Sequence, residues 1–135
     1  MRICFSLALP LAAATVSGKV QLVDSSNPDV RNKDYSGVAV WLERLDGMPP
    51  AAASATVKMA QKNKRFTPRV LAIPVGTTVD FPNLDPIFHN AFSNFSGQPF
   101  DVGLYAPGSS QKVPFRRDGI VRVFCNIHPT MSAVI

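Results

Sequence analysis

The sequence is short of the residues on which many metal clusters and disulfide scaffolds depend. Its 135 residues include two cysteines and two histidines. Zinc sites and iron–sulfur clusters built from four cysteines need more thiols than this, and a disulfide-rich secreted scaffold needs more cysteine pairs. A multicopper oxidase needs far more imidazoles. The composition therefore excludes all four classes.

Charge and long apolar runs are also scarce. Charged residues make up 17% of the chain and hydrophobic residues 46%, which is typical of a chain that buries a core. No apolar run is long enough to span a bilayer. The 12 prolines and 8 glycines predict many turns and few long helices. No nucleic-acid-binding motif is present, so nucleic acid is not an expected partner.

The N-terminal segment has the pattern of a cleavable export signal. A short basic start, Met1-Arg2, precedes an apolar run that reaches Leu11, and the small residues Ala12 to Ala14 follow. This order is typical of a secretory signal peptide. We therefore expect residues 1–14 to be removed by cleavage near Ala14, which predicts a periplasmic or otherwise exported protein.

Cleavage would change the cysteine count. Cys4 lies within the signal, so Cys125 is the one thiol of the expected mature chain. A lone thiol in an exported protein is buried and inert, paired with another chain, or bound to a ligand.

The rest of the chain has the pattern of short strands and turns. Apolar and polar side chains alternate over residues 77–83 and predict a strand, in which Pro82 marks either a sheet edge or the strand end. Residues 16–24 and 37–45 are further strand candidates, and Trp41 is expected in the core. No convincing amphipathic helix is present. Many short strands separated by turns predict an all-β sandwich.

A hairpin is expected late in the chain. Asp118-Gly119 separates two β-type runs, residues 113–117 and 120–125, and Asp-Gly between such runs is a strong hairpin signal. In the second run every other residue, including Val123 and Cys125, shares one face. Cys125 is expected to point toward the core.

Residue types that ligate copper gather in the last third of the chain. Cys125-x-x-His128-x-x-Met131 begins at the last residue of the run over 120–125, and His89 lies 36 residues before the cysteine. A thiolate and two imidazoles in a plane, with a weak axial thioether, form the ligand set of a blue-copper site. Each residue alone has an ordinary explanation, since Cys and Met are common in cores. Their combination in this order favours a metal site.

The segment from about Lys58 to Ile135 resembles the cupredoxin family, and in particular the plastocyanin and amicyanin group. The resemblance is carried by Gly76-Thr-Thr-Val79, Phe81-Pro-Asn83, Asp85, His89-Asn90 and Cys125-x-x-His128-x-x-Met131. It implies a Greek-key β-sandwich and one mononuclear type 1 copper ion. The implied copper ligands are His89, Cys125, His128 and Met131. It also implies that Asn90 ties the two ligand loops together by hydrogen bonds.

Other motifs, among them Phe66-x-Pro68, resemble a bacterial subgroup labelled methylamine-utilisation or plastocyanin-like. We expect a signal peptide over 1–14, an N-terminal β extension over 15–53 and a cupredoxin-like copper-binding domain over 54–135. The chain stops four residues after Met131, where the last strand of the family normally continues, so that strand is expected to be cut short.

Two surfaces have alternative interpretations. Five apolar residues flank the expected ligands and form either an exposed collar for partner docking or part of the core: Pro86, Ile87, Phe88, Ile127 and Pro129. The second surface is a basic group, which we interpret as a solvated face rather than a docking site. It comprises Lys58, Lys62, Lys64, Arg65 and Arg69.

Two function classes remain open. The first is a periplasmic carrier of single electrons that meets a transient protein partner, such as a dehydrogenase, a cytochrome or an oxidase. The second is a non-redox copper-binding or envelope-docking module. No enzymatic activity and no catalytic residue is expected, because His89 and His128 are both assigned as ligands.

Overall fold

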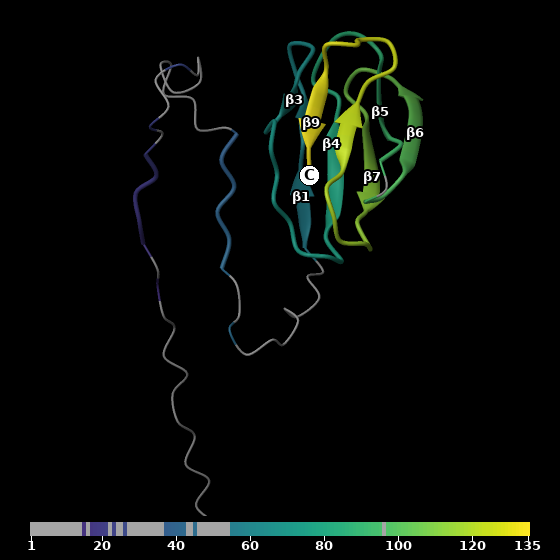
Figure 1. Cartoon of the computed structure of the whole chain (residues 1–135). Coiled ribbons are helices and arrows are strands. Elements are labelled where there is room, and N and C mark those ends of the chain that lie inside the picture. Colours follow the sequence, from purple (N-terminus) through teal and green to yellow (C-terminus); the bar gives the residue numbers. More distant parts are fainter. Residues whose placement is uncertain are drawn as a thin grey trace, which may run out of the picture. The chain divides into compact units, whose positions relative to one another are not determined.

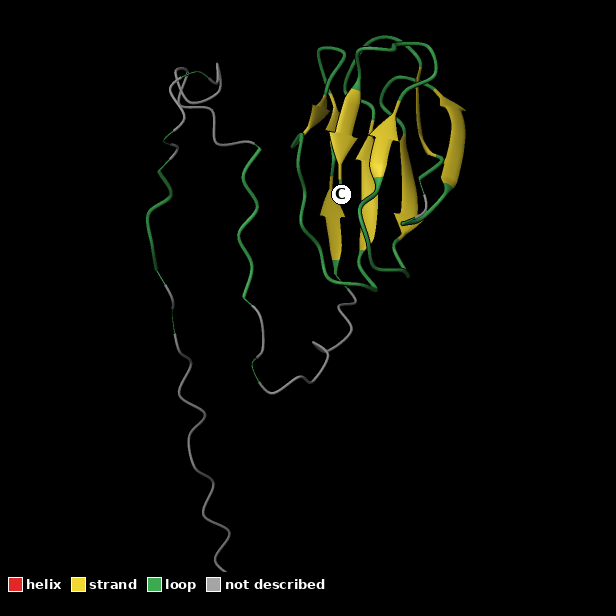
Figure 2. Ribbon diagram, in the orientation of Figure 1, coloured by secondary structure: helices red, strands yellow, loops and turns green. Residues whose placement is uncertain are grey.

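The computed structural model describes residues 15, 17–21, 23, 26, 37–42, 45, 55–95 and 97–135. The chain divides into two units, residues 1–33 and 34–135, and every named strand lies in the second unit. Figure 2 shows strands and loops, and no helix, in this described part of the chain. The described residues therefore contain no helix that is long and apolar enough to cross a membrane. The predicted signal peptide, residues 1–14, lies outside the described residues.

The predicted N-terminal β extension stays a prediction. Its described segments, residues 17–21 and 37–42, belong to no named strand, and most of the remainder of 15–53 lies outside the described residues. The expectation for Trp41 is wrong, because its side chain is 74% exposed. Among the described residues, 37–42 pair with no strand.

One sheet holds the strand predicted over residues 77–83. It has the order β1-β4-β7, with β1 (Thr56–Lys58) parallel and β7 (Ser110–Pro114) antiparallel to the central strand β4 (Thr78–Pro82). The predicted strand is therefore confirmed, and Pro82 marks its end rather than a sheet edge. Proline removes one donor at this strand end, and the next residue, Asn83, still donates its N–H to the Ser109 carbonyl at 2.9 Å.

A second sheet forms the other layer of the sandwich (Figure 1). Its order is β6 (Phe100–Tyr105), β5 (His89–Ser93), β8 (Arg122–Phe124) and β9 (Ser132–Val134), and all neighbours are antiparallel. A small antiparallel pair, β2 (Ala60–Gln61) with β3 (Phe66–Thr67), completes the fold. The all-β sandwich expected from the sequence is confirmed.

The hairpin predicted around Asp118-Gly119 is wrong. β7 pairs with β4, whereas β8 pairs with β5 and β9, so the connection crosses from one sheet to the other. Gly119 adopts a φ of 121°, which favours glycine. The Asp-Gly pair therefore supplies a turn, but this turn joins two layers.

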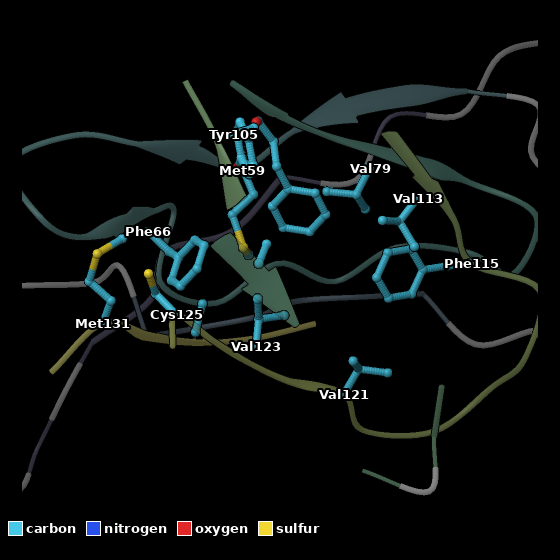
Figure 3. Packing of buried hydrophobic residues seen from close by; sticks show 13 residues of the cluster. Met59, Phe66, Val79, Tyr105, Val113, Phe115, Val121, Val123, Cys125 and Met131 are labelled. Carbon is cyan, nitrogen blue, oxygen red and sulfur yellow. The ribbon is translucent and has the colours of Figure 1, made fainter. Parts of the chain in front are cut away.

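The core lies between the two larger sheets, and one end of it carries sulfur. Val79 and Phe81 come from the first sheet, and Val123 from the second. Figure 3 shows Cys125 and Met131 at one end of this buried cluster. The predicted inward face of the run over residues 120–125 is confirmed, because Val123 is 0% and Cys125 3% exposed. Val121, on the same face, is also buried.

Candidate metal centre

Three nitrogen and sulfur donors meet at one end of the sandwich. His89 is the first residue of β5, Cys125 directly follows β8, and His128 lies in the loop between β8 and β9. Cys125 Sγ is 3.9 Å from His89 Nδ1 and 3.7 Å from His128 Nδ1. The three donor atoms all lie within 4.8 Å of one another. One ion bound at roughly 2.0–2.3 Å, as in zinc sites with these donors, fits among them.

A tight turn brings Met131 to the same end of the core. The Met131 N–H donates to the His128 carbonyl at 2.9 Å, which closes a four-residue β-turn. Pro129 is the second residue of this turn, a position that suits its fixed φ. Met131 is 1% exposed, and Figure 3 shows it at the same end of the core cluster as Cys125. The thioether thus joins a thiolate and two imidazoles, the donor set that copper prefers when it changes oxidation state.

The two histidines differ in their access to solvent. His89 is 0% exposed, whereas His128 is half-buried at the surface. Their ring centroids are 4.8 Å apart. Burial lowers the pKa of His128, its electrostatic interactions with His89 and Lys64 lower it further, and Asp85 opposes them. The result favours the neutral imidazole that a metal requires.

Asn90 links the strand of His89 to the loop that contains Cys125 and His128. Its side-chain Oδ1 accepts the Asn126 backbone N–H at 3.3 Å, and its Nδ2 donates to Asp101 Oδ1 at 2.7 Å and to the Gly103 carbonyl at 3.2 Å. The register of β5 and β6 shifts at this point. A bulge of this kind commonly re-aims side chains beside functional sites.

The opposite side of His89 meets a carboxylate. Asp85 Oδ2 lies 2.8 Å from His89 Nε2, and the two Asp85 oxygens also accept the backbone N–H groups of Asn63 (2.6 Å) and Lys64 (2.8 Å). Burial raises the pKa of Asp85, but the hydrogen bonds from Lys64, His89 and Asn63, together with the electrostatic interaction with His89, outweigh it, so the pKa lies below its usual 3.8. Asp85 is one of the residues that carry the resemblance to the cupredoxins, but that resemblance implied no role for it.

A buried polar network supports the same end of the sheet. The Tyr105 hydroxyl donates to Gln61 Oε1 at 2.7 Å, and Gln61 Nε2 donates to the Asn90 carbonyl at 2.9 Å. Asn83 Nδ2 donates to the Ile87 carbonyl at 2.8 Å, and Asn83 Oδ1 accepts the N–H of Asp85. Sequence reasoning missed Gln61, because nothing in its local pattern predicts a fully buried glutamine.

The five expected collar residues are largely at the surface. Phe88 is 55% and Ile127 46% exposed, Pro86 and Pro129 are exposed, and Ile87 is half-buried. Leu84 (57%) and Leu104 (58%) add exposed apolar area that the sequence did not predict. The five residues of the basic group are all exposed.

Solved structures with this fold are numerous, whereas no protein-family model and no curated protein matches the chain. A purple cupredoxin from Nitrosopumilus maritimus is 28% identical, with a TM-score of 0.52, over 59% of this chain and 95% of that one. A Cu-containing nitrite reductase from Thermus scotoductus is 33% identical, with a TM-score of 0.54, over 73% of this chain but only 24% of the enzyme. A reduced amicyanin variant has a TM-score of 0.55 at 17% identity, over 62% of this chain and 83% of that one.

Proposed function

We propose that this chain, a relative of the cupredoxins with their all-β fold, is an exported carrier of single electrons. Its neighbours and its donor set support a copper-binding protein of the electron-transfer type. The observation that carries the proposal is the position of Cys125 Sγ, within 3.9 Å of both imidazole Nδ1 atoms. A single buried thiolate between two imidazoles is the core of a type 1 copper site.

Each of the four donors has a distinct part. His89 Nδ1, Cys125 Sγ and His128 Nδ1 would hold the ion, and Met131 would supply the weak axial thioether. Copper, when bound, supplies a one-electron couple between Cu(II) and Cu(I). Asn90 would hold the two ligand-bearing segments at a fixed separation through its bond to Asn126. A framework held in this way keeps its geometry when the charge at its centre changes.

The exposed edge of His128 is the proposed route for the electron. His89, Cys125 and Met131 are buried, so His128 is the one proposed ligand with an edge at the surface. The exposed collar residues Pro86, Phe88, Ile127 and Pro129, with half-buried Ile87, flank the ligands in the chain and would let a protein partner approach closely and exclude water. A dehydrogenase, a cytochrome or an oxidase would serve as that transient partner.

We propose no catalytic role. The sequence has two histidines, and both are proposed ligands, which would leave no imidazole for a second metal or a nucleophilic triad. The likeness to nitrite reductase covers 24% of that enzyme, so it does not extend to the whole catalyst.

The test is to express the full chain in a Gram-negative host, add Cu(II) and record visible absorption and EPR spectra. The proposal predicts an intense thiolate-to-copper band and a type 1 EPR signal, both absent from Cys125→Ser. Absence of the band, or its persistence in Cys125→Ser, would overturn the type 1 assignment. Tight reversible Cu(I) transfer without a usable potential would favour a copper-storage module instead.

A further inference from the structure

We propose that Asp85 is a positioning residue that fixes the orientation of His89 and lowers the reduction potential of the metal centre. This inference rests on the function proposed above. Its basis is the contact between Asp85 Oδ2 and His89 Nε2, 2.8 Å long and buried on both sides. Because a carboxylate accepts, the imidazole Nε2 carries the proton and donates it.

The contact determines which ring nitrogen is free to bind a metal. With the proton on Nε2, Nδ1 keeps its lone pair, and Nδ1 is the atom that lies 3.9 Å from Cys125 Sγ. A flip of the ring would break this charge-assisted hydrogen bond and leave the buried Asp85 Oδ2 with the Lys64 N–H alone, which is costly. The carboxylate therefore selects one tautomer and one ring orientation before any metal arrives.

Asp85 is itself held rigidly from the other side. The backbone N–H groups of Asn63 and Lys64 donate to its two oxygens at 2.6 and 2.8 Å. These two residues form the turn between β2 and β3, each with a φ of 55°, so their N–H groups converge on the carboxylate as in other backbone anion nests. Asn83 Oδ1 also accepts the Asp85 N–H at 3.1 Å. Both carboxylate oxygens and the backbone N–H of Asp85 are thus hydrogen-bonded, which fixes the position of the carboxylate relative to the His89 ring.

The fixed negative charge of Asp85, next to the proposed ligand His89, affects the reduction potential of the metal. Asp85 is 7% exposed, so water screens its charge poorly. The hydrogen bond makes the His89 imidazole more basic, and the negative charge favours Cu(II) over Cu(I). Both effects lower the reduction potential relative to a site in which this acceptor is neutral.

The test is to measure the reduction potentials of the copper-loaded full chain with Asp85, Asp85→Asn and Asp85→Ala. We expect both variants to lose about 10- to 100-fold in Cu(II) affinity and less in Cu(I) affinity. The potential then rises by 59 mV for each tenfold change in the affinity ratio. Asp118→Asn is the matched control, because it removes one carboxylate from the other end of β8, and its potential should stay at the wild-type value. A merely structural role for Asp85 predicts that Asp85→Asn keeps the wild-type potential, and that result would overturn the proposal.

A second measurement uses the metal-free chain and does not depend on the variants. Nitrogen-15 NMR of the imidazoles should show His89 with a protonated Nε2 and an unprotonated Nδ1. A proton on Nδ1 would overturn the proposal even if Asp85→Asn failed to fold. If the wild-type chain had this tautomer but no thiolate-to-copper band, the proposed electron-transfer function would fail while the orienting role of Asp85 would stand.

Discussion

Asn90 Oδ1 accepts the backbone N–H of Asn126 at 3.3 Å, and this bond joins the two parts of the chain that bear the donor atoms. Asn90 follows His89 on β5, and Asn126 follows Cys125 after β8. The spacing between the imidazole and the thiol is therefore held by the fold itself, without help from a metal.

Replacing Asn90 with alanine should loosen this link. The change removes three hydrogen bonds of the fully buried Asn90 side chain, to Asn126, Asp101 and Gly103, so we expect a loss of about 1–3 kcal/mol in the free energy of unfolding and faster copper release. Urea unfolding of the metal-free chain and chelator-driven copper loss measure the two effects. Asn94→Ala, at an exposed position just after β5, should change neither. Equal copper release from the two variants would count against the link.

Replacing Met131 with leucine should raise the reduction potential with little cost in stability. The swap conserves core volume, so the expected loss is less than about 1.5 kcal/mol, while the axial thioether is removed. Met59→Leu is a matched control, because Met59 is 0% exposed and lies within the core cluster away from the proposed donors. Voltammetry of both variants should show a change for Met131→Leu alone. The same potential in both would remove Met131 from the ligand set.

The apolar collar should govern the approach of a redox partner. Phe88→Ser removes a ring that is 55% exposed next to His89, and a surface residue worth about 1.4 kcal/mol in an encounter changes a rate tenfold. We expect electron self-exchange, measured by NMR line broadening between oxidised and reduced protein, to slow by about tenfold at an unchanged potential. Ile120→Ser is the control, since Ile120 is 70% exposed at the other end of β8. Equal rates would show that the collar takes no part in transfer.

Tyr105 should make the fold sensitive to alkali. Burial raises the pKa of Tyr105 well above its usual 10.0, helped by the negative charges of Cys125 and Asp80. Because the unfolded chain releases this proton near pH 10 while the folded chain retains it, stability falls as pH rises above 10. In the metal-free chain, the wild type should lose about 1.4 kcal/mol per pH unit more than Tyr105→Phe in this range.

The tyrosine variant also has a cost at neutral pH. Tyr105→Phe leaves Gln61 Oε1 without its donor, so the variant should begin about 1–3 kcal/mol less stable. Urea unfolding at a series of pH values gives both numbers. Parallel curves for the two proteins above pH 10 would contradict the raised pKa.

The features predictable from the sequence were those set by local pattern and residue type. The alternation around Val123 and Cys125 predicted the buried face of β8 because strand periodicity needs only neighbouring residues. The four expected ligands could be named because the resemblance to the cupredoxins implies them at His89 and in Cys125-x-x-His128-x-x-Met131. Local pattern failed at Asp118-Gly119, since a turn signal does not determine which strands pair, and here the flanking strands belong to different sheets.

The surroundings of the metal site depend on contacts between distant residues. Asp85 is anchored by Asn63 and Lys64, more than twenty positions earlier, and Gln61 meets Tyr105 across 44 positions. No spacing rule connects such pairs. The sequence therefore predicted the donor set, and the structure adds how the donors are aimed.

One copper ion held by Cys125 should cycle by one electron, and spectroelectrochemical titration of the copper-loaded full chain measures this. The thiolate-to-copper band should disappear on reduction and return fully on oxidation, with a slope of 59 mV per decade for a one-electron couple. A band that does not return, or a slope for more than one electron, would contradict it.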